Sequence, residues 1–304
     1  MNAVAAPSLP KAWERFWFAP GNAVNVAVAR VLVSATALWM LLSRDLPALF
    51  GVPREFWAAV PRLFQWHYLL FPGHESLERL LLWTAVAALI ASGAGIWPRI
   101  SGLIAGVLVW HFAPLEGFLW SAGAFTWSIP ILGLFFLAAA PATHIISSSR
   151  NAGPDAEPWQ FGWPLQLIKV QLCFLYLFSA YSKLWESGLS WAAPAHMQAW
   201  LLGMYQRESP VFTYLPPRVA AHPLACGAMG VAALLFELSF PLVLFSRKAR
   251  MILIPAAFAM HLGIVFVLNI TIQYFPVLLV FVDWSSLAAR YRRRDEIYSK
   301  ATSH

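Results

Sequence analysis

Charged residues are scarce in this chain. Aspartate, glutamate, lysine and arginine make up 12% of its 304 residues, whereas about a quarter of the residues in an ordinary globular domain are charged. Hydrophobic residues account for 60% of the chain, and the mean hydropathy is +0.62. A water-soluble surface needs more charge than this, so the composition excludes a soluble domain and predicts a membrane protein.

Cysteine and the common catalytic motifs are scarce as well. The two cysteines, Cys173 and Cys226, fall inside apolar stretches, so we expect packing residues rather than a disulfide framework or a metal site. The sequence contains no glycine-rich phosphate loop, no HExxH, no GxSxG and no paired CxxC, which leaves nucleotide-driven and zinc chemistry without support. It also shows no internal repeat, and this weakens the interpretation as an inverted-repeat transporter.

Long apolar stretches, by contrast, recur along the whole chain. A transmembrane helix needs about 20 apolar residues, and we place such spans near residues 22–43, 78–97, 99–115, 124–143, 163–184, 223–245, 251–270 and 274–290. Their near-even spacing predicts an all-α fold, a polytopic membrane helical bundle of about eight transmembrane helices that forms a single membrane domain over residues 1–304. We expect the first span to be retained, because prolines and charges interrupt the opening stretch MNAVAAPSLPKAWERFWF and leave no apolar core for a cleaved signal peptide.

Two other apolar stretches are broken up by prolines, charges or histidines. They are PALFGVPREFWAAVPRLFQWHYLLF at residues 47–71 and LSWAAPAHMQAWLLGMY at residues 189–205. We interpret both as interfacial helices or hairpins that lie at the membrane surface.

The distribution of lysine and arginine predicts the orientation. If the N-terminus is cytoplasmic, twelve of the lysines and arginines outside the spans lie on that side and six on the other, as the positive-inside rule requires. We therefore predict a multi-pass protein of the cell membrane, with residues 1–21 and 291–304 as cytoplasmic tails. The basic run RYRRR at residues 290–294 is interpreted as an anchor to anionic lipid, which makes the lipid bilayer the expected partner. Nucleic acid is the alternative partner for this run, and it is disfavoured because the run directly adjoins a span.

We single out five ionisable residues within the predicted spans: Arg30, Lys169, Lys183, Glu237 and His261. A charge at the centre of a transmembrane helix costs about 2.5 to 3.5 kcal/mol on insertion scales, so it usually faces the bundle interior and has a partner. Arg30 lies roughly 12 Å inside the first span, too deep to reach the surface easily. We expect Glu237 to pair with Arg30 or one of the lysines, and we predict Arg30 or Lys169 in particular. A purely structural ion pair is the alternative. Headgroup contact is the alternative for Lys169, and a hydrogen bond to a nearby hydroxyl or carbonyl is the alternative for His261.

Lys183 differs from the others in its position and its neighbours. It ends the apolar run YLFSAYSK, and Lys169, Tyr176 and Lys183 follow one another at seven-residue intervals, so they project from one stripe of a helix. Glu186, three residues further on, can hold the ammonium group. A lysine kept from water by aromatic neighbours can accept a proton, and contact with the outer headgroups is the alternative. We predict an outer-leaflet cavity beside Lys183, lined by Tyr176, Trp185, Trp191 and His261.

The segment KVQLCFLYLFSAYSKLWESGLSW, residues 169–191, carries a family resemblance. It resembles a span of the vitamin K-dependent gamma-carboxylase superfamily, also called the horizontally transferred transmembrane domain (HTTM) family, which ends in a lysine-leucine pair before a tryptophan-containing loop. Other parts of the family are similar, in the same order, to VARVLVSATALWML with Arg30, SGAGIWPRISGL, FELSFPLVLF and MHLGIVFVLNITIQYFPVLLVF. The resemblance covers about residues 22–285, the HTTM-like core.

The resemblance implies that Lys183 is the base that deprotonates a reduced quinone of the vitamin K type, which would be the cofactor. In that family the oxygenated quinone then removes a proton from a peptide glutamate so that carbon dioxide can add. His261 is a second catalytic candidate here, and the expected partner is a peptide or a lipid-soluble substrate. The candidate substrate-binding residues are Arg30, Tyr176, Glu186, Trp191 and Glu237.

Two departures from the family pattern narrow this expectation. The family's asparagine-histidine pair after the third span is missing from PLEGFLWSAGAFTW at residues 114–127, where His111 lies a few residues upstream as a substitute. The family's large extracytoplasmic domain has no counterpart after the last span. We therefore expect a membrane enzyme that acts on a quinol-like or peptide substrate rather than a glutamate carboxylase. The alternative is a non-enzymatic membrane maturation, immunity or transport partner whose buried charges only hold the helices together.

Overall fold

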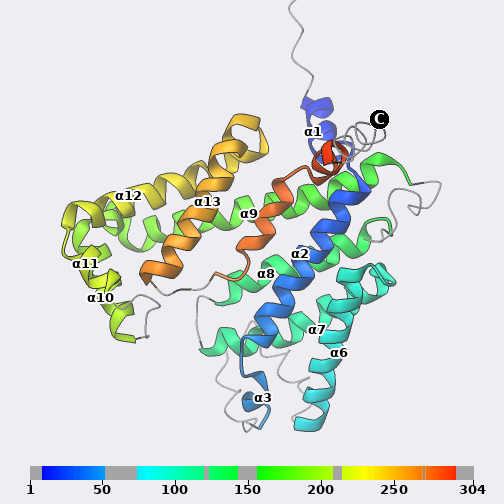
Figure 1. Ribbon diagram of the computed structural model, residues 1–304, viewed down its shortest axis with the longest axis horizontal. Coiled ribbons are helices and arrows are strands. Elements are labelled where there is room, and N and C mark those ends of the chain that lie inside the picture. The colour runs from blue at the N-terminus through cyan, green and yellow to red at the C-terminus, as the bar shows by residue number, and fades with distance from the viewer. Residues whose placement is uncertain are drawn as a thin grey trace, which may run out of the picture. The chain divides into compact units, whose positions relative to one another are not determined.

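The computed structural model describes residues 9–51, 74–119, 123–142, 156–207, 214–268, 270 and 272–291. Over these ranges the chain is helical and contains no strand (Figure 1), so the predicted all-α class is confirmed. Among these residues, five segments are long and apolar enough to cross a membrane: α2 (Ala23–Leu42), α6 (Glu75–Ala94), Pro158–Ala192, Pro223–Leu244 and α13 (Arg247–Leu268). The third comprises α9 (Pro158–Ser187) and the 3-10 helix η1 (Gly188–Ala192), and the fourth comprises α12 (Pro223–Ser239) and η2 (Phe240–Leu244).

The predicted count of eight spans is not confirmed. The predicted third and fourth spans coincide with α7 (Pro98–Leu119) and α8 (Gly123–Ala139), which contribute the shorter apolar helices Pro98–Ala113 and Thr126–Ala139. The predicted eighth span is not one continuous helix. There η3 (Phe275–Phe281) ends before Asp283, and a separate helix covers residues 284–291.

The predicted interfacial stretches are described in part. Most of residues 47–71, and the basic run beyond residue 291, lie outside the described residues, and the small helix α3 (Leu46–Leu49) precedes the first gap. The second stretch forms nearly all of η1 and most of α10 (Pro194–Arg207), and α11 (Leu215–Ala220) follows it.

The chain divides into two compact units, one made of Met1–Ile168 with Val282–His304 and the other of Lys169–Phe281. In the first unit, α2, α6, α7 and α8 pack against one another. A Cβ atom on Gly106 of α7 would lie 3.0 Å from the Phe135 ring of α8, and one on Gly133 of α8 would lie 3.1 Å from Val33 of α2. Lipid gives helices no hydrophobic reason to associate, so membrane helices commonly pack closely through such small residues.

Two parts of the first unit that are distant in sequence meet at Asp283. Asn25 of α2 donates a side-chain hydrogen bond to Asp283 at 3.2 Å, and the backbone N–H of Ser285 donates to the Asn25 side chain at 3.1 Å. The hydroxyls of Ser285 and Ser286 also donate to the Asp283 carboxylate, each at 2.6 Å. These hydrogen bonds lower the pKa of Asp283, which lies outside the five candidate spans. They hold the beginning of the helix at residues 284–291 against the beginning of α2.

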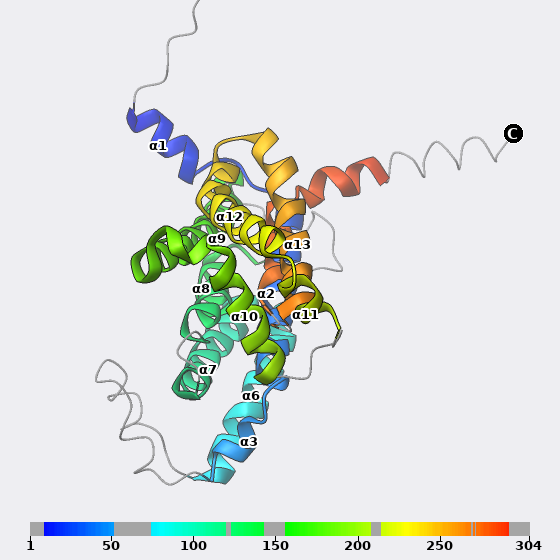
Figure 2. The same ribbon diagram turned by 90° about the vertical axis from the view of Figure 1, so that its left-hand side faces the viewer.

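In the second unit, α10 packs against α11 and α12, and η1 lies against α12 (Figure 2). A Cβ atom on Gly230 of α12 would lie 2.9 Å from the Cα atom of Ala192, so the backbone of η1 approaches α12 as closely as a glycine allows. Cys226 belongs to a buried core with Met197, Leu201 and Ala220, and both it and Cys173 are buried free thiols. Their predicted role as packing residues is therefore confirmed.

The segment that joins α1 (Leu9–Trp17) to α2 provides a test of packing in the first unit. The Gly21 N–H donates to the Pro158 carbonyl at 2.8 Å, and a Cβ atom on Gly162 of α9 would lie only 1.9 Å from the Ala19 carbonyl oxygen. We expect Gly162→Ala to destabilise the protein by about 1 to 3 kcal/mol, because overpacking forces backbone to move. Thermal unfolding in detergent measures this change.

Gly263→Ala is the matched control, since Gly263 lies in α13 and a Cβ there meets nothing within 4 Å. Alanine favours a helix over glycine, so this control should be neutral or stabilising. Equal stabilities for the two variants would contradict the close contact at Gly162.

Candidate functional site

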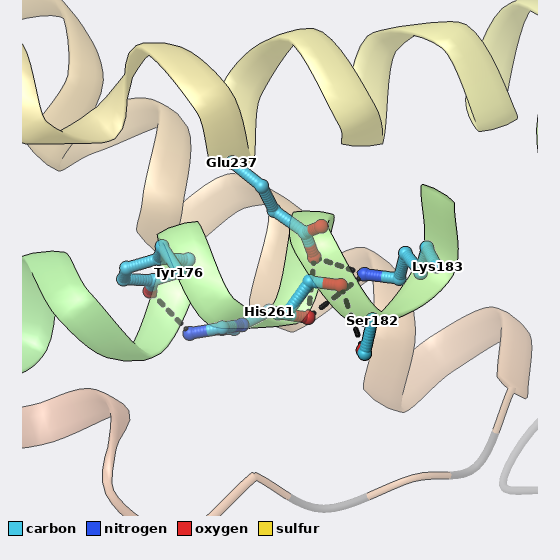
Figure 3. A network of polar contacts seen from close by, with 6 residues as sticks. Tyr176, Ser182, Lys183, Glu237 and His261 are labelled. Atoms are coloured by element: carbon cyan, nitrogen blue, oxygen red, sulfur yellow. Dashed lines mark hydrogen bonds and ion pairs between the residues drawn. The ribbon is translucent and has the colours of Figure 1, made fainter. Parts of the chain in front are cut away.

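Three helices of the second unit bring polar side chains together (Figure 3). Helix α9 supplies Tyr176, Ser179 and Lys183, α12 supplies Glu237, and α13 supplies His261. The three α9 residues are spaced by three and four positions, so they project from one face of that helix. This face of α9 is the polar stripe that the sequence predicts, although Ser179 was expected only at its flank.

Lys183 makes three contacts that suit a positive charge. Its Nζ atom forms an ion pair with Glu237 Oε1 and donates a hydrogen bond to Ser179 Oγ at 2.9 Å. The same atom lies 4.8 Å from the centroid of the Trp191 ring, which is a cation–π contact. The Lys183 side chain is 21% exposed and that of Glu237 is 8% exposed, so the pair is largely buried and can be approached from the lysine side.

Ser179 links the two charged groups. Its hydroxyl accepts the hydrogen bond from Lys183 and donates one to Glu237 Oε1 at 3.1 Å. Glu237 Oε1 therefore receives two donors. Glu237 Oε2 is buried and has no hydrogen-bond partner among the residues that the structure describes. Oε1 of Glu237 is thus hydrogen-bonded, whereas Oε2 is open, which here means buried and without a hydrogen-bond partner among the described residues.

Tyr176 and His261 form a second buried pair. The Tyr176 hydroxyl and His261 Nε2 are hydrogen-bonded at 2.8 Å, and both side chains are buried. The Tyr176 ring packs against Phe240 at a centroid distance of 4.1 Å and meets Phe236 edge-on at 5.5 Å. His261 Nδ1 is buried without a partner in the described part of the chain. One ring nitrogen of His261 is therefore satisfied by a hydroxyl, and the other is open.

The structure corrects two predictions about the surroundings of Lys183. Trp185 does not line a cavity beside Lys183, since it is 77% exposed and stacks on Tyr181 at 5.9 Å. It follows Lys183 by two positions, which on a helix is nearly the opposite face. Glu186 does not hold the ammonium group, because the ion pair is formed with Glu237 and Glu186 is exposed. The predicted proximity of Trp191 to Lys183 is confirmed, whereas the cavity itself stays a prediction.

Glu237 has a cationic partner, as expected, but the partner is Lys183 rather than Arg30 or Lys169. Lys169 is half-buried near the beginning of the same polar stripe. The candidate substrate-binding roles of Tyr176, Glu186, Trp191 and Glu237 stay predictions.

Arg30 has hydrogen-bond partners within the first unit. Its side chain is buried, and Nη2 donates to the carbonyl oxygens of Leu137 at 3.1 Å and Pro141 at 2.9 Å. The Leu137 carbonyl lies in the last turn of α8 and the Pro141 carbonyl lies just after it. Carbonyls at the C-terminal end of a helix lack intrahelical partners and attract a cation. The geometry therefore gives Arg30 a structural role, and its candidate substrate-binding role stays without support.

Sequence reasoning missed one buried pair in the first unit. His111 Nε2 of α7 lies 3.0 Å from Glu78 Oε2 of α6, and the Glu78 side chain is almost completely buried. Glu78 falls at the edge of the predicted second span, where an acidic residue is ordinarily an exposed residue of the first helical turn. Only the packing of α6 against α7 reveals the pair. Among the described residues, no group of three or more histidines, cysteines, aspartates or glutamates is arranged to hold a metal ion.

No family model, curated protein or solved structure matches this chain.

The Tyr176–His261 hydrogen bond has a measurable energetic effect. We expect Tyr176→Phe to lower the free energy of unfolding by about 1 to 3 kcal/mol, because it leaves a second buried nitrogen of His261 without a partner. Reversible unfolding in detergent measures the difference. Tyr181→Phe is the control on the same helix, since Tyr181 is exposed and surface substitutions usually change stability by less than about 0.5 kcal/mol. An unaltered stability of Tyr176→Phe would contradict the buried hydrogen bond.

Proposed function

We propose that this chain is a multi-pass integral membrane protein of the HTTM, gamma-carboxylase-like family and that it is an enzyme. It removes a proton from a lipid-soluble substrate at the Lys183–Glu237 pair. The membrane assignment is supported by five apolar helices of sufficient length among the described residues. The family assignment is supported by the ordered resemblance of the segments around Arg30, Lys183, Glu237 and His261.

One observation carries the enzymatic assignment. The Lys183–Glu237 and Tyr176–His261 pairs, which are built from α9, α12 and α13 (Figure 3), each leave one buried polar atom open. Glu237 Oε2 and His261 Nδ1 have no hydrogen-bond partner within the described ranges. Buried polar groups are nearly always satisfied in folded proteins, so two open atoms at one place favour a site that a substrate completes.

The chemistry of these groups favours a substrate with an ionisable hydroxyl. A carboxylate oxygen and a cation can remove a hydroxyl proton and hold the resulting anion. The aromatic rings of Trp191, Phe236 and Phe240 border the two pairs, which suits an aromatic ring such as that of a quinol. The family resemblance points to the same class, a reduced quinone of the vitamin K type, and it assigns the base to Lys183.

A non-enzymatic role is the second candidate function, and one observation favours it. Arg30 is a fully buried charge that makes structural hydrogen bonds in this chain, since its guanidinium donates to carbonyl oxygens at and just after the end of α8. On this alternative, the Lys183–Glu237 pair only joins α9 to α12. The protein would then serve as a membrane partner in maturation, immunity or transport.

A spectroscopic experiment separates these functions. Purified protein in lipid nanodiscs is mixed anaerobically with 2-methyl-1,4-naphthoquinol, whose absorbance distinguishes the quinol from its anion. We expect the wild-type protein to form the bound anion. Lys183→Ala should lose this signal at least 100-fold at a temperature where the variant is folded, since general acid–base catalysis contributes about that much. Lys169→Ala, on the same stripe of α9, should behave as the wild type. A wild-type protein that leaves the quinol spectrum unchanged would contradict the proposed enzyme.

Reporter fusions test the predicted orientation in the cell membrane. A green fluorescent protein attached to the C-terminus should fluoresce, and alkaline phosphatase at the same point should be inactive, because both termini are predicted to be cytoplasmic. Fusions after Arg207, on the predicted outer side, should give the opposite pattern. An active phosphatase at the C-terminus would reverse the predicted topology.

A further inference from the structure

The contacts of Lys183 are those of an ammonium group. Two of its three N–H donors are directed to Ser179 Oγ and Glu237 Oε1, and its charge lies over the Trp191 ring. A neutral amine would lose both the ion pair and the cation–π attraction. A lysine that acts as a base must instead present a free lone pair to the substrate, and this arrangement offers none.

The open acceptor belongs to Glu237. A carboxylate can accept hydrogen bonds on both oxygens, and here Lys183 and Ser179 take only Oε1. Oε2 is buried and has no partner within the part of the chain that the structure describes. It is therefore the acceptor that a substrate hydroxyl could use without breaking a hydrogen bond of the pair.

We infer that Glu237 Oε2 accepts the proton and that Lys183 is the cation that stabilises the anion formed. In this step the O–H bond of the substrate breaks and a new O–H bond forms on Oε2. The electron pair stays on the substrate oxygen, which becomes negatively charged. Glu237 becomes a neutral carboxylic acid, so Lys183 exchanges one anionic partner for another and the total charge is unchanged. The step needs no oxidant or reductant.

This inference rests on the proposed function, and it reverses the role that the family resemblance gives to Lys183. A proton-accepting role for Glu237 also explains why the Lys183–Glu237 pair is only partly exposed and why Oε2 has no hydrogen-bond partner among the described residues. Ser179 holds the lysine and the carboxylate in register, and the partial exposure of Lys183 leaves a route to the pair.

Two substitutions distinguish the two bases, with the same naphthoquinol assay in nanodiscs. Arginine keeps a positive charge but cannot give up its proton in a protein, so Lys183→Arg should retain anion formation within about tenfold of the wild type. Glutamine has nearly the shape of glutamate but cannot accept the proton, so Glu237→Gln should lose at least 100-fold. Glu237→Asp restores a carboxylate and should recover part of the anion formation that Glu237→Gln loses. Such a recovery shows that Glu237→Gln fails because it lacks a proton acceptor and not because its packing is changed.

The possible results separate this inference from the proposed function. A wild-type protein that forms no anion overturns both. If the wild type forms the anion, the inference alone is overturned when Glu237→Gln remains active, or when Lys183→Arg is as inactive as Lys183→Ala. Thermal unfolding of each variant is measured in parallel, and any variant that unfolds early is assayed at a temperature where it is folded.

Discussion

A lysine from α9 and a glutamate from α12 form an ion pair inside the second unit, where Glu237 is buried and Lys183 is largely buried. Removing one partner of a buried ion pair leaves an uncompensated charge, which typically costs about 3 to 5 kcal/mol. This requirement keeps α9 and α12 in one register. The close approach of η1 to α12 at Gly230 then holds Trp191 over the Lys183 ammonium. Gly230 and Trp191 thus both help to fix the geometry of the Lys183–Glu237 ion pair.

The chain contains buried polar groups of two kinds. Arg30 donates to the carbonyls at the end of α8, and its surroundings are those of a structural arginine. The pairs around Glu237 and His261 each leave one open atom among the described residues. Buried side-chain oxygens without a partner among the described residues also occur at Ser34 and Thr36 of α2, and Glu78 keeps one beside His111 in the first unit. The candidate site is therefore marked by two such atoms on helices that also carry a partly exposed lysine, and not by an open atom alone.

The helices could be predicted well from the sequence, and their interruptions less well. Apolar stretches of about 20 residues correspond to the five candidate spans, because length and composition decide whether a helix can cross a membrane. Residues 274–290 are also largely apolar, yet Asp283 begins a new helix there by accepting hydrogen bonds from Ser285 and Ser286. Average hydropathy does not detect hydrogen bonds of this kind, so it does not predict where one helix ends and the next begins.

The candidate site could be predicted in its residues but not in its pairings. Seven-residue spacing placed Tyr176 and Lys183 on one face of α9, since helical periodicity is local. The partner of Lys183 is Glu237 on another helix rather than Glu186 three residues away, because a buried carboxylate needs a cation more than an exposed one does. Which helices meet depends on packing, and packing between distant segments cannot be read from one sequence.

The most direct test of this account is the distance between the two charged groups in the membrane. Solid-state NMR of protein labelled with ¹⁵N-lysine and ¹³C-glutamate in bilayers reports whether Lys183 Nζ lies against the Glu237 carboxylate. The account predicts a cross-peak between Lys183 Nζ and Glu237 Cδ that disappears in Glu237→Gln. An unpaired Lys183 signal in the folded wild-type protein, unaltered by that substitution, would contradict it.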